Sequence, residues 1–236
     1  MTAVTEVDTG KCQTGEYRKM LESLPVFMNV SDDAFIEIMD FIAEIDKLKT
    51  ISRQTLILDG TRYENDAEHS WHISVMAPLL IRYLDGEAPD LLKTIKMALI
   101  HDMVEIFAGD TYCYDKAASA DKKEREEAAA KRLFGILPDA QAEEFLNLWH
   151  EFEEMKTIES AYAAALDKLQ PLIHNYLTDG KSWKLHGVYA GEVRVRISQL
   201  RSVSLKLWEF ADSIISMSVS KGYLKAEPID KKMHKN

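Results

Sequence analysis

The sequence predicts an all-α protein, and three observations carry this prediction. Apolar residues recur at spacings of three and four in several long segments, which is the period of a helix with one buried stripe. No run of alternating β-branched and aromatic residues stands out between turn clusters, so strand signals are nearly absent. With 10 Gly and 6 Pro among 236 residues, long disordered or low-complexity tracts are not expected.

The first predicted helix covers the segment from the SDD start at 31–33 to about Thr50. These three residues supply an N-cap and first-turn acids, which stabilise the free amides at a helix start. The next segment, 51–66, contains the turn dipeptide Asp59-Gly60 and is predicted to be a connecting loop. The apolar stripe of this helix consists of Phe35, Ile38, Met39, Ile42, Ile45 and Leu48.

The second and third predicted helices follow that loop. The second begins near Asp66 and crosses Pro78, which we expect to kink it because proline lacks an amide donor. The third opens at Pro89 and runs to a stop at Gly109. Because it is apolar nearly all round, we expect it to lie in the centre of the domain.

The remaining helices and the domain limits follow from stop signals and composition. No internal repeat and no linker rich in Pro, Ser or Gly is present, so one domain is expected rather than two. The expected division is a tail and lead-in at 1–24, one helical domain at 25–222 and a charged tail at 223–236. The later helices are predicted at about 120–134, 138–155, 157–177 and 190–221.

Charge and cysteine content exclude several classes of protein. The chain has 29 basic against 39 acidic residues and a net charge of -10, which disfavours a binder of long nucleic acids because such proteins need clustered Lys and Arg. Cys12 and Cys113 cannot form a disulfide framework. No signal peptide and no apolar run of about 18 residues is evident. We therefore expect a soluble cytoplasmic protein without membrane contacts.

Two histidines and two aspartates fall within the predicted helices. His101 and Asp102 interrupt the apolar segment ALIHDMVEIF, where burying an imidazole beside a carboxylate costs free energy unless the two are paired or bind a cation. His69 lies in the second predicted helix, and Asp167 in the alanine-rich segment ESAYAAALDKLQ. Taken singly, each of these residues is equally explained as a hydrogen-bonded core residue or an ion-pair partner.

Taken together, these residues carry a resemblance. The strings AEHSWH, LIHDMVEIFAGD and ALDKLQP, in this order, resemble the signature of the HD-domain metal-dependent phosphohydrolases, in particular the branch that includes bacterial 5′-deoxynucleotidase. The resemblance covers about residues 30 to 222 and implies a helical HD-domain bundle. It also implies that His69, His101, Asp102 and Asp167 hold one divalent ion, which this mixed donor set leaves open among Mn²⁺, Co²⁺, Fe²⁺, Zn²⁺ and Mg²⁺.

The resemblance further implies residues for catalysis and for substrate binding. Glu105 and Asp110 match the acidic positions of an HDxxE motif followed by GD, where one of them orients or deprotonates the attacking water or protonates the leaving oxygen. The alternative is that Glu105 steers a ligand histidine and Asp110 is a turn residue. Arg53 corresponds to a family arginine that holds the phosphate, and Lys116 and Lys168 are further candidates.

The implied function is hydrolysis of a phosphomonoester by a metal-activated water, with a nucleoside or deoxynucleoside 5′-monophosphate as the expected substrate. Relatives with two metals carry extra histidines between the HD pair and the last aspartate, where this chain offers only His150. One metal is therefore expected, and the resemblance also implies a homodimer. The alternatives are another phosphate ester, a cyclic nucleotide, an oxidative cleavage, or a regulatory module that binds a metal or nucleotide without catalysis. The presence of all the motif residues argues against the last.

Overall fold

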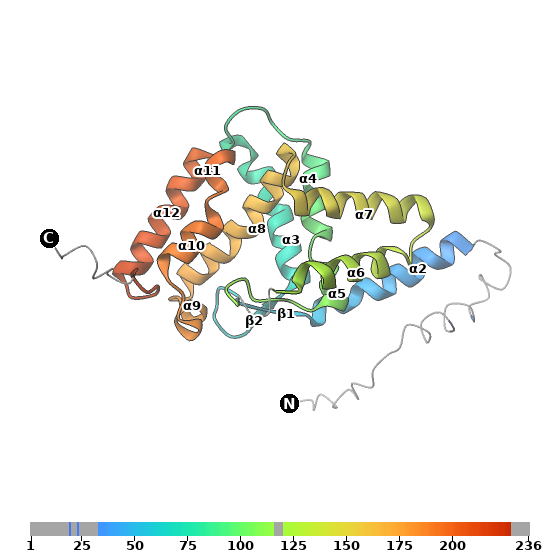
Figure 1. Cartoon of the computed structure of the whole chain (residues 1–236), viewed down its shortest axis with the longest axis horizontal. Coiled ribbons are helices and arrows are strands. Elements are labelled where there is room, and N and C mark those ends of the chain that lie inside the picture. Colours follow the sequence, from blue (N-terminus) through green and yellow to red (C-terminus); the bar gives the residue numbers. More distant parts are fainter. Residues whose placement is uncertain (1–18, 20–22, 24–32, 116–119, 228–236) are drawn as a thin grey trace, which may run out of the picture.

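Helix α8 (Ile158–Leu177) runs through the middle of the computed structural model, and the other long helices pack around it (Figure 1). The structure describes residues 19, 23, 33–115 and 120–227. Helix α8 has 20 residues. It packs against α3, α4 and α7, which precede it in the chain, and against α10, α11 and α12, which follow it. The predicted all-α fold is confirmed.

The segment before α3 contains the two strands of the described residues. Helix α2 (Asp33–Ile45) continues into a 3-10 helix, η2 (Asp46–Thr50), so the first predicted helix ends where expected. Its proposed cap at Ser31 and Asp32 lies outside the described residues.

The loop predicted at 51–66 was wrong, because strands β1 (Ser52–Leu56) and β2 (Tyr63–Asn65) form an antiparallel hairpin. Ser52 pairs with Asn65 and Leu56 with Tyr63, with an irregularity between these pairs. Strands of five and three residues are too short to show an alternating apolar pattern. Gly60, with φ of 69°, lies in the connection between the two strands.

The second predicted helix is close to the observed one. Helix α3 (Asp66–Leu80) continues through Pro78 and passes into a 3-10 turn, η3 (Ile81–Tyr83).

The third predicted helix was wrong at both ends. Helix α4 (Leu91–Ile100) starts later, since Asp90 caps it by accepting from the amides of Leu92 and Lys93.

Helix α4 also ends earlier than predicted, before the His-Asp pair. Residues 101–104 form a tight turn, in which the amide of Met103 donates to the carbonyl of Ile100, and a short helix, α5 (Glu105–Ala108), follows. His101 and Asp102 therefore lie where regular helical hydrogen bonding stops, and not inside a continuous helix.

The later helices are α6 (Lys122–Phe134) and α7 (Asp139–Glu154), both close to prediction, followed by α8. The single helix predicted at 190–221 was wrong. Ser204 has an extended backbone, and its side chain accepts from the amide of Leu207, so it ends one helix and caps the next. The chain forms α9 (Lys181–His186), which was not predicted, and then α10 (Ala190–Ile197), α11 (Leu200–Val203) and α12 (Leu205–Ser220).

Two apolar cores flank the junction of α3, α4 and α8. The larger core includes Ile73, Leu166 and Ile215 and joins α3 and α8 to the C-terminal helices. The second, around Ile100 and Phe134, joins α2 and α4 to α5, α6 and α7. Packing continues after α12, where Leu224 is buried. None of the helices in the described residues is long and apolar enough to cross a membrane.

Candidate metal centre

Helix α3 places His69 one turn inside its N-terminus. Asn65 caps this end, because its side chain accepts from the amide of Glu68 while the Glu68 carboxylate accepts from the amide of Asn65. This reciprocal cap fixes the point at which the hairpin strand β2 turns into the helix. As a result, His69 is fully buried and faces α4 and α8.

Helices α4 and α8 supply the other three predicted ligands. His101 and Asp102 follow the last turn of α4, and Asp167 lies near the middle of α8. The residues before Asp167 include Ala163, Ala164 and Ala165, all buried, whose small side chains let α8 approach its neighbours closely. Thus three helices that pack on one another bring together residues that are up to 98 positions apart.

Ligand atoms of His69, His101 and Asp167 lie within 4.8 Å of one another, and the carboxylate of Asp102 lies beside the point where they meet. Nε2 of His69 lies 3.1 Å from Oδ1 of Asp167 and 4.0 Å from Oδ2 of Asp102. Nε2 of His101 lies 3.2 Å from Oδ1 of Asp102 and 3.7 Å from Oδ1 of Asp167. The structure therefore brings together every residue of the predicted ligand set.

Both imidazole rings turn the same nitrogen toward this point. Nδ1 of His101 lies 2.9 Å from the carbonyl of Ala98, and Nδ1 of His69 lies 3.0 Å from Oε1 of Gln170. Carbonyl and amide oxygens only accept hydrogen bonds, so each Nδ1 carries the proton when the ring is neutral. Each Nε2 then presents a lone pair to the point where the ligand atoms meet.

Without a metal ion, the positive charge beside these carboxylates comes from protonated His101 and from Arg53. Burial disfavours the charged form of His101, but Asp102 and Asp167 outweigh it and raise the pKa of His101 to about 10. Burial and the positive charge of Arg53 lower the pKa of His69 to about 4. Burial also opposes ionisation of Asp167, yet the imidazoles of His101 and His69 beside it hold its pKa well below its ordinary value.

The residues fit a divalent metal ion. Nε2 of His101 is buried and has no hydrogen-bond partner, which is costly unless another group binds it. Two neutral imidazoles and two carboxylates form a donor set that suits Mn²⁺, Fe²⁺, Co²⁺ or Zn²⁺. His69, His101, Asp102 and Asp167 would hold the ion.

Glu105 and Asp110 lie beside this set. Glu105 is buried, and one of its carboxyl oxygens lies within 4.8 Å of one of Asp66, which was not predicted as a site residue. Burial and the charges of Asp102 and Asp66 raise the pKa of Glu105 well above its ordinary value. Burial likewise raises the pKa of Asp110. Helical spacing placed Glu105 with His101, but it groups with Asp66 and Asp102 because the helix is interrupted between them.

Arg53 projects from β1 into the same acidic region. Its Nη1 lies 2.6 Å from Oδ2 of Asp102 and 3.1 Å from Oδ1 of Asp66. Burial lowers the pKa of Arg53, but these carboxylates more than compensate and raise it well above its ordinary value. Because the hairpin was expected to be a loop, the position of Arg53 opposite Asp102 could not be foreseen.

A cavity of about 920 Å³ opens onto these side chains. Arg53, His101, Asp102, Glu105, Asp110 and Asp167 line it. Lys122, Lys168 and Arg196 also line it, and of these only Lys168 was singled out from sequence. Lys116, the other lysine considered, lies outside the described residues. The cavity thus combines a cluster of carboxylates with several cationic groups, which an anionic substrate would require.

His150, considered as an extra metal ligand, lies away from this region. Its Nε2 lies 3.0 Å from Oε2 of Glu127, and its side chain is 40% exposed.

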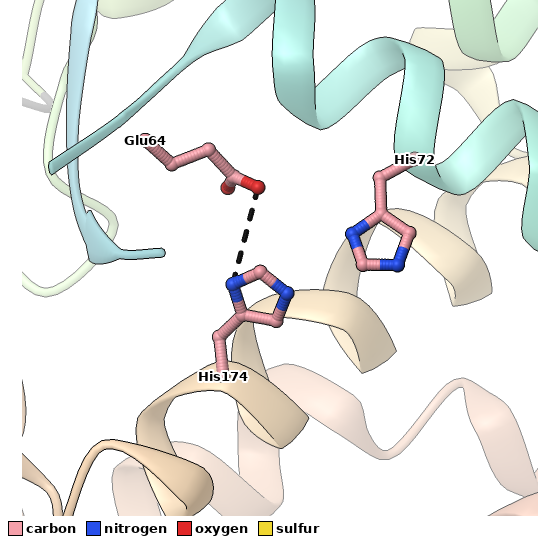
Figure 2. Close-up of side chains that lie close together, drawn as sticks. All are labelled: Glu64, His72 and His174. Atoms are coloured by element: carbon pink, nitrogen blue, oxygen red, sulfur yellow. Dashed lines mark ion pairs between the residues drawn. The ribbon is translucent and has the colours of Figure 1, made fainter. Parts of the chain in front are cut away.

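A second group of possible ligands was not anticipated. Glu64, His72 and His174 lie close together on the far side of Gln170 (Figure 2).

The chain is similar in sequence and in fold to known proteins. Residues 45–208 match the family described as HD domain. A curated relative, 5′-deoxynucleotidase HDDC2 of Dictyostelium discoideum, is 29% identical over 143 residues, which are 58% of this chain and 75% of that protein. The human protein of the same name is 26% identical over 58% of this chain and 65% of its own length.

Solved structures give the same picture. A predicted metal-dependent phosphohydrolase from Magnetospirillum magnetotacticum MS-1 is 49% identical and aligns with a TM-score of 0.78 over 82% of this chain and 96% of its own. The PH0347 protein from Pyrococcus horikoshii OT3 is 23% identical, with a TM-score of 0.54 over 78% of this chain and 99% of its own. This second likeness concerns the fold alone.

Proposed function

The chain belongs to the HD-domain family, and its relatives include proteins named 5′-deoxynucleotidase and metal-dependent phosphohydrolase. We propose that it hydrolyses nucleoside or deoxynucleoside 5′-monophosphates. The products would be a nucleoside and inorganic phosphate. The observation that carries this proposal is the group formed by His69, His101 and Asp167, whose ligand atoms lie within 4.8 Å of one another, with Asp102 beside them. Their cavity is large enough for a nucleotide-sized ligand.

One divalent ion held by these four residues would supply Lewis-acid polarisation of a phosphoryl oxygen and a lowered pKa for an attacking water. The rest of the chemistry falls to the protein. Nδ1–H of His101 and of His69 hold their rings in place, through the carbonyl of Ala98 and the amide of Gln170. Within the described residues, Gln170 separates His72 and His174 from these ligands and His150 pairs with Glu127, so we propose one ion.

Glu105 and Asp110 are the proposed proton-transfer residues. Both line the cavity next to Asp102, where one carboxyl oxygen can take a proton from the attacking water and the other can return one to the leaving oxygen. The position of Glu105 beside Asp66 and Asp102 supports this assignment, since their negative charges make its carboxyl group bind a proton more readily. The pH dependence of phosphate release by Glu105→Gln and by Asp110→Asn would show which of the two residues acts as the acid.

Arg53 is the proposed phosphate ligand. Its guanidinium lines the cavity within hydrogen-bond distance of Asp102, so it can orient an anion beside the proposed metal. A bound phosphate would compete with Asp66 and Asp102 for the guanidinium donors. Lys168 of α8 and Arg196 of α10 line the same cavity and add positive charge to it.

We further propose that the protein acts as a homodimer in the cytoplasm. Helix α12 leaves Leu205, Phe210 and Met217 about half exposed, and a second copy that covers them would bury apolar surface. Light scattering of the purified protein would give twice the monomer mass. A monomer at micromolar concentration would contradict this part of the proposal, and a label-based localisation experiment tests the compartment.

The decisive experiment measures phosphate release from a panel of deoxyribo- and ribonucleoside 5′-monophosphates, each with Mn²⁺, Co²⁺, Fe²⁺, Zn²⁺ or Mg²⁺. We expect release with at least one ion and none in the presence of a chelator. A parallel panel contains cyclic nucleotides and non-nucleotide phosphate esters. Activity confined to that second panel would replace the proposed substrate, and no release from either panel would favour a regulatory module.

A further inference from the structure

A cluster of four polar side chains lies directly behind His69. Glu64 comes from β2, His72 from α3, and Gln170 and His174 from α8. Figure 2 shows the carboxylate of Glu64 pointing at the ring of His174, with the ring of His72 beside them. Glu64, Gln170 and His174 are all at least 95% buried, so their polar atoms need partners within the protein.

Ligand atoms of Glu64, His72 and His174 lie within 4.8 Å of one another, a spacing that would also suit a cation. However, the amide nitrogen of Gln170 lies among them. Its Nε2 is 2.6 Å from Oε1 of Glu64, 3.1 Å from Nε2 of His174 and 3.3 Å from Nδ1 of His72. A side-chain amide, and not an ion, therefore links the three residues.

The donors and acceptors of this cluster can be assigned from their partners. Nδ1 of His174 lies 3.1 Å from the carbonyl of Leu56, so it donates there, and Nε2 of this ring accepts. The Gln170 amide then donates one hydrogen to Glu64 and the other toward His174. A flipped amide would set its oxygen against the Glu64 carboxylate at the same short distance. The orientation of Gln170 is thereby fixed.

Fixing this amide also fixes His69. With Nε2 held by Glu64 and His174, Oε1 of Gln170 faces Nδ1 of His69 at 3.0 Å and accepts its proton. Oε2 of Glu64, which has no hydrogen-bond partner, lies 3.7 Å from the same Nδ1 and presents a second acceptor oxygen on that side. Both effects keep the proton on Nδ1 and leave the lone pair of Nε2 facing Asp167.

We propose that Gln170, oriented by Glu64 and His174, is a positioning residue that sets the tautomer and the ring direction of His69 for metal binding. This inference rests on the proposed metal centre and deepens it. Partners behind a metal-bound histidine typically change metal affinity by about 10- to 100-fold when they are removed. Gln170 does not line the cavity, so it acts through His69 and not on the substrate.

The test is calorimetric titration of the whole protein with Mn²⁺, compared among the wild type and four variants. Gln170→Leu removes both the acceptor for His69 and the donor to Glu64, and we expect its Kd for Mn²⁺ to rise about 10- to 100-fold. Glu64→Gln keeps an acceptor for the Gln170 amide. Its Kd for Mn²⁺ should stay within about threefold of wild type, a much smaller change than that expected for Gln170→Leu.

Tyr162→Phe is the matched control for loss of a buried hydrogen bond. Its hydroxyl donates to the carbonyl of Ala77 at 2.7 Å, so like Gln170 it joins α8 to α3, but it does not contact His69. We expect it to lower the melting temperature by about 2–4 °C and to leave the Kd for Mn²⁺ unchanged. Gln170→Leu should instead change both quantities.

Two outcomes would overturn the inference. One is a wild-type Kd for Mn²⁺ in Gln170→Leu, which would make the residue merely structural. The other is two Mn²⁺ ions per wild-type chain and one in His174→Ala, which would make the cluster itself a metal site. If the wild type bound neither Mn²⁺ nor any of the other four ions of the phosphate-release panel, the proposed metal centre itself would be contradicted. Failure of the positioning role and failure of the metal centre are therefore distinguishable.

Discussion

Nε2 of His69 lies 3.1 Å from Oδ1 of Asp167, although 98 residues separate them in the sequence. The contact joins α3 to α8 at the point where α4 ends, so the geometry of the proposed metal centre depends on the packing of three helices. A carboxylate that close to a neutral imidazole lone pair is poorly satisfied without a proton or a cation between them. This relationship leads to the first prediction.

Asp167→Asn preserves the shape of the side chain and removes its charge. We expect the Kd for Mn²⁺ to rise by more than about 100-fold, since even residues behind a ligand cost up to that factor, and phosphate release to disappear. Circular dichroism should still report a helical protein. Hydrolysis at the wild-type rate by the metal-free variant would contradict the proposed ligand role of Asp167.

Glu105→Gln tests proton transfer separately from metal binding. If Glu105 moves a proton, kcat should fall about 10²- to 10⁴-fold while the Kd for Mn²⁺ stays close to wild type. Glu153→Gln is the control, because Glu153 also lines the cavity but is not a predicted catalytic residue. Steady-state kinetics of both variants decide the matter. Equal and small losses in kcat would remove Glu105 from the mechanism.

Arg53→Leu should destabilise the metal-free protein. It leaves the carboxylates of Asp66 and Asp102 buried without their cation, which costs about 3–5 kcal/mol when one partner of a buried pair is removed. Urea unfolding in the presence of a chelator measures this loss. Arg62→Leu, which breaks the exposed pair with Glu68, should cost about 1 kcal/mol or less. Similar losses in the two variants would argue against a buried Arg53 cluster.

Addition of metal should stabilise the wild type. At an Mn²⁺ concentration of about 100 Kd, binding to the folded state alone contributes about 2.7 kcal/mol. For a protein of this size that corresponds to a rise in melting temperature of about 5–10 °C. A chelator should reverse the shift, and Asp167→Asn should show almost none. A full shift in that variant would place the stabilising ion elsewhere.

A carboxylate far from the proposed metal centre should give a pH-dependent stability. Burial by itself raises the pKa of Glu151, but hydrogen bonds from Lys93 and Thr157 outweigh it and hold the pKa below the ordinary value of 4.5. The folded protein therefore binds fewer protons here than the unfolded chain. This stabilisation is complete above about pH 5 and is lost as the pH falls through the folded pKa.

Glu151→Gln keeps the shape of that side chain and removes its charge. We expect its free energy of unfolding to be about 0.5–1 kcal/mol lower than that of wild type at pH 7, with the difference closing by about pH 3. Urea unfolding across this pH range measures it. Glu144→Gln, which loses an exposed pair with Lys96, is the control with a change near zero. A difference for Glu151 that persists in acid would exclude a charge effect.

Most of the helical architecture could be predicted because helix signals are local. The stripe from Phe35 to Leu48 and the cap at Thr157 depend only on nearby residues. The errors occurred where a contact outside the segment decides. The hairpin of β1 and β2 depends on pairing across a turn, and the break at Ser204 depends on a side-chain cap that a long apolar period conceals.

The sequence by itself determined which residue types are available for chemistry: the order of His69, the His101-Asp102 pair and Asp167 already carried the resemblance and the expected ligand set. Only the tertiary structure decided how they meet. It placed the pair after the end of α4, grouped Glu105 with Asp66, set Arg53 against Asp102 and put Gln170 behind His69.

The physical reason is that ligand chemistry belongs to single side chains, whereas distances between them are set by the packing of whole helices. Close packing fixes those distances to within tenths of an ångström, and burial then makes every unpaired polar atom costly. The unpartnered Nε2 of His101 and the locked amide of Gln170 are consequences of that packing, and no periodicity in the chain announces either of them.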